Sequence, residues 1–320
     1  MGLRQTGDGA AARDALLSAA RVARTLGWLR AARTALFEGA LAAHEVSDYR
    51  SMLAAFREMS TLERERGQVA RAAQAIMFLG TVYTELGQYT QAMGHFERAE
   101  AMLEKVQIRH GLAPRILNAM ATARRLTGEH GRALVLAERG LALATQHRDR
   151  MDLLSTLATV RAALGEHEAA VLAFEDALEL ARKSEPPARV AIFVGNVGQA
   201  KMRAGDHEGA QEALDEAHAT FVRVDHAPSI ATALTNLGYL ALQRGRHAEA
   251  LTHCERAVEV AKGVENPFLL ASAQQNVGEC LLALGRHTDA IEHFTKNVEL
   301  ADLLGARSLV VEGQLGLVQC

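Results

Sequence analysis

The sequence predicts an all-α protein built as a solenoid of helical hairpins, and two observations support this fold class. The first is a motif, clearest at 78–99, that describes two helices joined by a tight turn. The second is the recurrence of this motif at a spacing of about 40 residues, which is typical of α-solenoids. Because each repeat of a solenoid contacts only its neighbours, we expect one elongated domain over residues 1–320 rather than two globular domains.

In the clearest copy of the motif, small and aromatic residues mark one face of each helix. Gly80 and Tyr83 share a face of the first helix. Gly87 ends that helix, because glycine accepts the left-handed conformation of a C-terminal cap. The second helix is marked at helical spacing by Tyr89, Ala92, Phe96 and Ala99. We expect Gly80 and Ala92 to lie where the two helices cross, since small side chains let the backbones approach closely.

The same pattern recurs five more times along the chain. The turn glycines after Gly87 are Gly128, Gly165, Gly205, Gly245 and Gly285, at successive steps of 41, 37, 40, 40 and 40 residues. Helix pairs are therefore predicted at 28–66, 69–106, 112–146, 151–183, 186–224, 228–264 and 267–304. In the pair at 28–66, Ser47 and Asp48 replace the turn glycine.

These positions resemble the tetratricopeptide repeat. The matching residues in two successive repeats are Leu237, Gly238, Ala250 and Ala257, then Val277, Gly278, Ala290 and Phe294. The repeats are longer than the usual length of about 34 residues, and in this they resemble those of the LGN/Pins adaptors, the kinesin light chains and the regulator MalT. The resemblance implies a right-handed α-solenoid that binds peptides or proteins.

Half units are predicted at both ends of the chain, at 1–25 and 308–320. Met1–Asp8 has the pattern of the end of a first helix, and Ala10–Thr25 that of a second helix without its partner. Ser308–Cys320 has the pattern of a first helix that no second helix covers, although terminal repeats normally carry a polar outer face. We therefore expect a segment of a longer protein. The alternative is a short protein that self-associates through this apolar end.

Composition argues against several classes of protein. The net charge of −3 favours neither nucleic acid nor a membrane surface, and no apolar run reaches the roughly 18 residues of a membrane span. The three cysteines, Cys254, Cys280 and Cys320, lack metal-ligand spacing, and such a sparse set is typical of a cytoplasmic protein. Arginine outnumbers lysine and alanine is abundant, which favours a bacterial source. We expect no cofactor.

Three asparagines form the main candidate binding site. Asn196, Asn236 and Asn276 directly precede the Val-Gly or Leu-Gly pair in three successive repeats. Equivalent positions of the first helices line the concave groove of a stacked array, where a carboxamide can both donate to and accept from a peptide backbone. The alternative is that each asparagine bonds a neighbouring helix. The earlier repeats have Phe78, Ala119 and Thr156 at this position.

The same register adds further groove residues around the asparagines. These are Gln199, Tyr239, Glu279, Arg125, Arg203 and Arg115. Together they form a polar, mildly basic wall, which favours a peptide with some acidic residues. The alternative is an ordinary solvated helix face.

Five histidines occupy one position of the repeat, two residues after the turn glycine. They are His130, His167, His207, His247 and His287. Successive repeats hold them too far apart to share a metal ion, so we interpret them as packing residues and expect no metal site. Tyr89 and Tyr49 occupy the same position.

Motifs for catalysis are missing from the sequence. The glycine-rich stretch at 7–14 lacks the lysine of a phosphate-binding loop, and His167–Glu168 lacks the second histidine of a zinc-protease helix. We therefore predict a non-catalytic interaction scaffold, not an enzyme, that binds a peptide or partner protein in its concave groove. The alternative is a ligand-sensing regulatory array within a larger signalling ATPase, kinase or transcription regulator.

Overall fold

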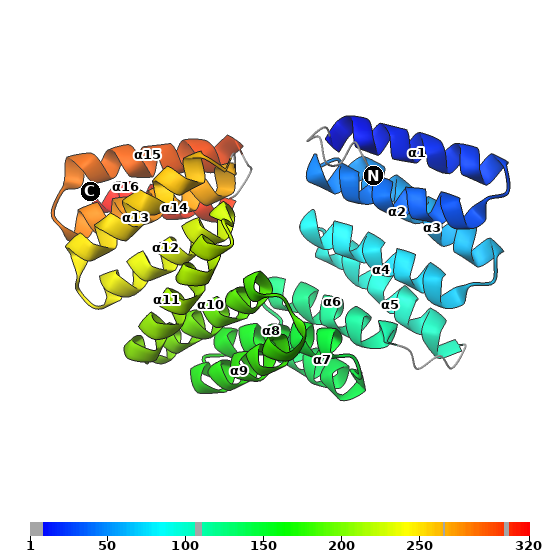
Figure 1. The fold of residues 1–320 in the computed structure, drawn as a ribbon, viewed down its shortest axis with the longest axis horizontal. Helices are drawn as coiled ribbons and strands as arrows, with labels where there is room; N and C mark the ends of the chain where they lie inside the picture. Colours follow the sequence, from blue (N-terminus) through cyan, green and yellow to red (C-terminus); the bar gives the residue numbers. More distant parts are fainter. Residues whose placement is uncertain (1–8, 106–110, 265, 304–306) are drawn as a thin grey trace. The chain divides into compact units, whose positions relative to one another are not determined.

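The computed structural model describes residues 9–105, 111–264, 266–303 and 307–320, which form sixteen helices and no strand (Figure 1). The predicted helix end at Met1–Asp8 lies outside the described residues. The first eight helices are α1 (Gly9–Thr25), α2 (Leu29–Glu45), α3 (Tyr49–Glu65), α4 (Val69–Glu85), α5 (Tyr89–Lys105), α6 (Leu112–Leu126), α7 (His130–Leu143) and α8 (His147–Ala163). The other eight are α9 (His167–Ser184), α10 (Pro187–Ala204), α11 (His207–Arg223), α12 (Ala227–Gln243), α13 (His247–Lys262), α14 (Pro267–Ala283), α15 (His287–Leu303) and α16 (Arg307–Gln319).

The chain divides into two compact units, Met1–Val160 and Arg161–Cys320, and the division falls inside α8. Within each unit, helices that follow one another in the sequence pack side by side as antiparallel neighbours (Figure 1). The packed layers are therefore local, as expected for helical repeats. The sequence predicted an all-α stack of hairpins, and each unit is built in this way.

The turns between the helices share one backbone conformation. Eight glycines adopt it, with φ between 69° and 83°: Gly27, Gly67, Gly87, Gly128, Gly165, Gly205, Gly245 and Gly285. This left-handed region is open to glycine at little cost. Ser47 adopts the same conformation with φ of 55°, and the carboxylate of Asp48 then caps α3 by accepting from the backbone N–H of Ser51. Ser47 and Asp48 thus make the turn that glycine makes elsewhere.

Two of these turns lie between the predicted repeats. Gly27 joins α1 to α2 and Gly67 joins α3 to α4 with the same left-handed turn. The helices α1 and α2 pack closely, because a methyl group on Gly39 of α2 would lie 2.8 Å from Cδ2 of Leu17. Every adjacent pair from α1 to α5 is therefore a hairpin with the same turn. The grouping of these helices into repeats stays a prediction.

Close contact within a hairpin comes from a glycine in the first helix that faces a large side chain in the second. Gly80 of α4 lies against the ring of Phe96 in α5, and Gly278 of α14 against the ring of Phe294 in α15. Both rings are at most 1% exposed. The predicted close approach at Gly80 is thus made against an aromatic ring, with Ala92 also fully buried.

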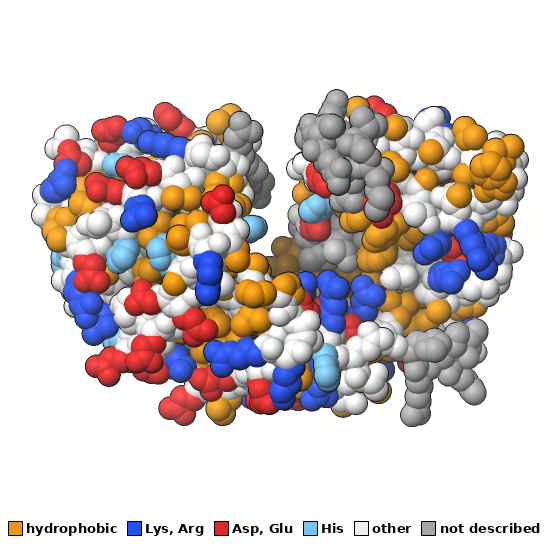
Figure 2. Space-filling view, viewed as in Figure 1, with side chains coloured by type: hydrophobic (Ala, Val, Ile, Leu, Met, Phe, Trp, Pro, Cys, Tyr) orange, Lys and Arg blue, Asp and Glu red, His pale blue; other side chains and the backbone are white. Residues whose placement is uncertain are grey.

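The surface of the second unit carries both signs of charge. On the face drawn in Figure 2, acidic and basic side chains are interspersed over this unit. Among the described helices, none is both long and apolar enough to cross a membrane.

Candidate binding face

The three predicted asparagines lie at equivalent positions of three first helices in the second unit. Asn196 is on α10, Asn236 on α12 and Asn276 on α14, and each side chain is half-buried. The helix α12 packs against both α10 and α14, so the three helices lie side by side. We refer to Asn196, Asn236 and Asn276 together as the asparagine row.

Helical geometry sets the direction in which the asparagine row faces. Each asparagine precedes by two residues a glycine that faces the second helix of its own hairpin: a methyl group on Gly198 would lie 2.9 Å from Cγ of Leu214. Two residues turn an α-helix by about 200°. The asparagines therefore lie on the side of the first helices that faces away from the second helices.

None of the three carboxamides makes a side-chain hydrogen bond to another residue in the part of the chain that the structure describes. Asn297 of α15 shows the opposite behaviour. Its side chain is fully buried, and Nδ2 donates to the backbone oxygen of Ala271 in α14 over 2.8 Å. The fold thus uses Asn297 to join helices, while the asparagine row keeps its donors and acceptors available.

The predicted neighbours of the asparagine row differ in exposure. Tyr239 is exposed, and Gln199 and Glu279 are half-buried. Glu279 is held in place, since Nε2 of Gln275 donates to its Oε1 over 3.0 Å. Burial raises the pKa of the Glu279 carboxyl; the Gln275 hydrogen bond opposes this shift and the charge of Glu312 adds to it.

Replacing Glu279 by Gln is expected to raise the melting temperature near pH 8 and to leave it unchanged near pH 4. The folded state holds this proton more tightly than the unfolded state, so the carboxyl's contribution to stability is full at low pH and falls as the pH rises through its folded pKa. The amide keeps an oxygen that can accept from Gln275 and cannot ionise. Melting curves of both proteins across this pH range test the effect, and equal curves at every pH would contradict it.

The three predicted arginines fall in different units. Arg203 is exposed near the end of α10 in the second unit. Arg115 and Arg125 belong to α6 in the first unit, so the structure does not group them with the asparagine row. In the first unit, the charge of Arg115 affects the buried side chain of Asp149. Burial raises the pKa of the Asp149 carboxyl, and the charges of Arg115 and Arg148 oppose that rise.

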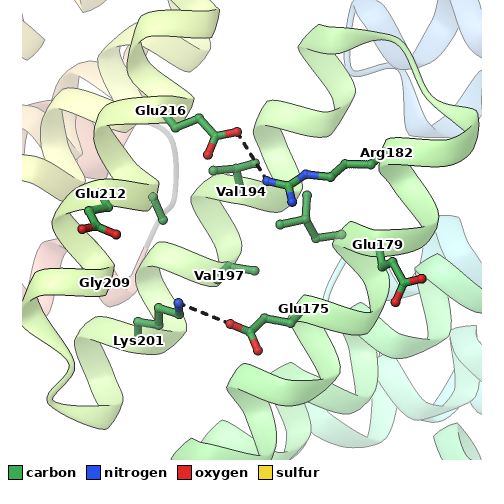
Figure 3. Close-up of a pocket in the computed structure, with 11 residues that line it drawn as sticks. Glu175, Glu179, Arg182, Val194, Val197, Lys201, Gly209, Glu212 and Glu216 are labelled. Carbon is green, nitrogen blue, oxygen red and sulfur yellow. Dashed lines mark ion pairs between the residues drawn. The ribbon is translucent and has the colours of Figure 1, made fainter.

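Sequence reasoning missed a groove of about 370 Å³ formed by α9, α10 and α11 (Figure 3). Its apolar part includes Val194 and Val197 of α10. Two ion pairs, drawn in Figure 3, lie along it: Nζ of Lys201 is 3.3 Å from Oε1 of Glu175, and Nη2 of Arg182 is 3.6 Å from Oε1 of Glu216. The sequence contains one sign of this groove. The second helices carry glutamates four residues apart, which places them on one helix face: Glu175 and Glu179 on α9, and Glu212 and Glu216 on α11.

The five repeated histidines each form the first residue of a second helix. Four of them are half-buried and His287 is exposed. Nδ1 of His130, His167 and His207 is buried, and no described residue forms a hydrogen bond with it. The described residues contain no group of three or more histidine, cysteine or acidic side chains placed to hold a metal ion.

Comparisons with known proteins agree with this architecture. The family model described as "Tetratricopeptide repeat" matches residues 71–146, 189–263 and 229–302, and a model of anaphase-promoting complex subunit 5 matches residues 118–194. No curated protein matches the chain.

Three solved structures show the same fold at low sequence identity. BtubC (BKLC) from P. vanneervenii is 21% identical with a TM-score of 0.55, over 68% of this chain and 91% of that one. A Rap protein complexed with competence and sporulation factor is 18% identical with a TM-score of 0.56, over 98% and 97%. A signal transduction ATPase with numerous domains and a tetratricopeptide repeat sensor, from Pyrococcus horikoshii, is 14% identical with a TM-score of 0.59, over 98% and 50%.

The hairpins and the available polar face define a class, that of helical repeat proteins that serve as protein-interaction modules. The matched segments cover more than half of the chain. The chain therefore belongs to the tetratricopeptide repeat family, and the predicted all-α solenoid fold is confirmed.

Proposed function

We propose that the asparagine row binds an extended segment of a partner protein or peptide, and that the chain acts as a non-catalytic scaffold. The observation that supports this is the presence of three equivalent, half-buried carboxamides on adjacent helices, without a hydrogen bond to a described residue. Each carboxamide can donate to one backbone carbonyl and accept from one backbone N–H. The predicted concave groove is the surface on which this contact is made.

The spacing of the helices suits an extended ligand. Packed helices lie roughly 8–10 Å apart, and an extended chain advances roughly 3.3 Å per residue. Neighbouring asparagines therefore meet ligand peptide units about three residues apart. Helices hold the three side chains in place before binding, which limits the entropy lost by the protein.

The proposal is tested by a pull-down from the native cells with the intact chain as bait, beside a variant with Asn196, Asn236 and Asn276 all changed to Ala. Partners that bind the intact chain and not the variant support the asparagine row. Equal recovery with both baits would remove it as the binding site. We also propose that the protein is bacterial and cytoplasmic. Separating the native cells into subcellular fractions and detecting the protein among them tests this location.

A second candidate function is a sensor array within a larger signalling protein. It is favoured by the similarity to the ATPase with a tetratricopeptide repeat sensor, of which the matched region spans 50%. The mass of the native protein distinguishes the scaffold from the sensor. A native chain much longer than 320 residues that includes a nucleotide-binding domain supports the sensor.

Self-association through α16 forms a further part of the proposal. Its outer face exposes Val311, Leu315 and Val318, which are 53%, 57% and 84% accessible. Burying such a face against a second copy removes apolar surface from water. Light scattering is expected to show dimers that Leu315→Glu dissociates. A monomer at all concentrations would contradict this part alone.

A further inference from the structure

Two charged residues in the first unit occupy positions that are apolar and buried in the other repeats. Arg33 lies fourteen residues before the turn at Ser47, and Glu63 sixteen residues after it. The first position is filled elsewhere by Ala73, Pro114, Met151, Ala191, Ala231 and Ala271, and the second by Leu103, Ala144, Ala181, Phe221, Ala261 and Ala301. All twelve of these residues are buried. In the repeat formed by α2 and α3, an ion pair therefore replaces a contact between apolar side chains.

The ion pair leaves two buried polar atoms unused. The Glu63 side chain is completely buried, and its Oε1 accepts from Nη1 of Arg66 over 3.2 Å. Nε of Arg33 lies 3.8 Å from the same Oε1, which is beyond hydrogen-bond distance. Oε2 of Glu63 and Nε of Arg33 are both buried and have no hydrogen-bond partner among the described residues. The site thus holds one free acceptor and one free donor.

Arg33 and Glu63 also line a cavity of about 200 Å³ between α2, α3 and α4, and their two free atoms lie buried beneath its wall. Arg33 and Glu63 line it together with the rings of Phe37 and Phe78, which lie 5.6 Å apart, and with Arg71. Arg71 is exposed and has no ion pair with a described residue. Phe78 stands at the position that carries asparagine in the later repeats.

Stability does not account for this arrangement. Buried ion pairs are often no more stabilising than packed apolar residues of similar size, and an unsatisfied buried polar atom is unfavourable. The next repeat shows the apolar solution, because Ala73 and Leu103 pack in one hydrophobic core there. A ligand that satisfies both free atoms would explain why this repeat differs.

We propose that this cavity binds a primary amide, the side chain of a glutamine or asparagine in a peptide. Because both atoms are buried, the side chains of Arg33 and Glu63 turn toward the cavity on binding. The amide NH₂ then donates to Oε2 of Glu63, and the amide oxygen accepts from Nε of Arg33. A carboxylate is disfavoured because it meets the buried carboxylate of Glu63, and a cation is disfavoured by Arg33, Arg66 and Arg71. Apolar residues that flank the amide pack on Phe37 and Phe78. This site does not depend on the asparagine row.

The test uses the full chain and three fluorescein-labelled peptides, Gly-Ser-Phe-X-Phe-Ser-Gly with Gln, Glu or Leu as X. We expect the Gln peptide to bind about tenfold more tightly than the Leu peptide and more tightly than the Glu peptide. The double variant Arg33→Ala, Glu63→Leu copies the pair of the next repeat, and it is expected to lose the preference for Gln without a lower melting temperature. Arg64→Ala, an exposed arginine beside Glu63, serves as the control and should keep the preference.

A second variant keeps the proposal testable if the double variant does not fold. Glu63→Gln preserves the shape of the side chain and weakens its acceptor, so the preference for the Gln peptide is expected to fall. Equal binding of the three peptides, tightest binding of the Glu peptide, or no binding of any of them to the intact chain would overturn the proposal.

Discussion

Replacing Phe294 by Ala is expected to lower the free energy of unfolding of the second unit by about 3–5 kcal/mol. The Phe294 ring is fully buried in the core of this unit. Glycines of two other helices lie against it: a methyl group on Gly278 of α14 would be 2.6 Å from its Cε1, and one on Gly316 of α16 would be 2.5 Å away. The glycines have no side chain that could move into the space, so removal of the ring leaves a cavity.

Urea unfolding followed by circular dichroism measures this loss. Ile291→Ala on the same helix is the matched control, because Ile291 is exposed and its truncation should cost about 0.5 kcal/mol or less. Repeat arrays can unfold in parts, so the transition of the second unit is the relevant one. A Phe294→Ala protein that unfolds at the same urea concentration as the Ile291→Ala control would show that the ring does not hold these three helices together.

Changing all three residues of the asparagine row to Ala is expected to weaken partner binding by about 1.5–4.5 kcal/mol. Each lost hydrogen bond contributes about 0.5–1.5 kcal/mol net, and the sum is an upper range because neighbouring sites often fail to add. The melting temperature should change little, since the three carboxamides make no hydrogen bond to a described residue.

A matched control places three substitutions on the second helices of the same hairpins. Glu212, Thr252 and Glu292 are exposed and lie seven residues after their turn glycines, and the control changes each of them to Ala. This protein should bind the partner as the intact chain does. If the asparagine variant instead melts at a much lower temperature and loses binding only as it unfolds, the asparagines hold the fold together and do not bind.

Much of the fold could be predicted because the same local rules recur along the chain. A glycine that needs positive φ, followed by alanine and a large side chain at helical spacing, defines a hairpin without reference to distant residues. The turn at Ser47 shows the limit of this rule. Serine reaches the same conformation there with help from the Asp48 cap, and Gly27 and Gly67 make the same turn between the predicted repeats, midway between the turns of the motif.

The candidate site could be predicted only in part. The register of Asn196, Asn236 and Asn276 follows from the repeat, and so does the face on which they lie. The exposure of the residues beside them does not follow from the repeat, because it depends on which helix covers each residue. The pKa of Glu279 is raised by burial and by Glu312 of α16, which lies in the next repeat.

The Arg33 and Glu63 pair shows what sequence alone leaves open. In the sequence, both residues are charged at positions that are apolar in the other repeats. Charged residues usually lie on a solvated helix face, so the sequence alone suggests that both are exposed. Their contact depends on the packing of α2 against α3. Only the structure shows that Glu63 is fully buried and that its Oε2 has no hydrogen-bond partner among the described residues.

Hydrogen exchange on the chain with and without its captured partner tests the central claim most directly. The account predicts that partner binding slows exchange in α10, α12 and α14, around Asn196, Asn236 and Asn276, and leaves the second helices α11, α13 and α15 unchanged. Slower exchange confined to α9 and α11, around the groove of Figure 3, or confined to the first unit would contradict it.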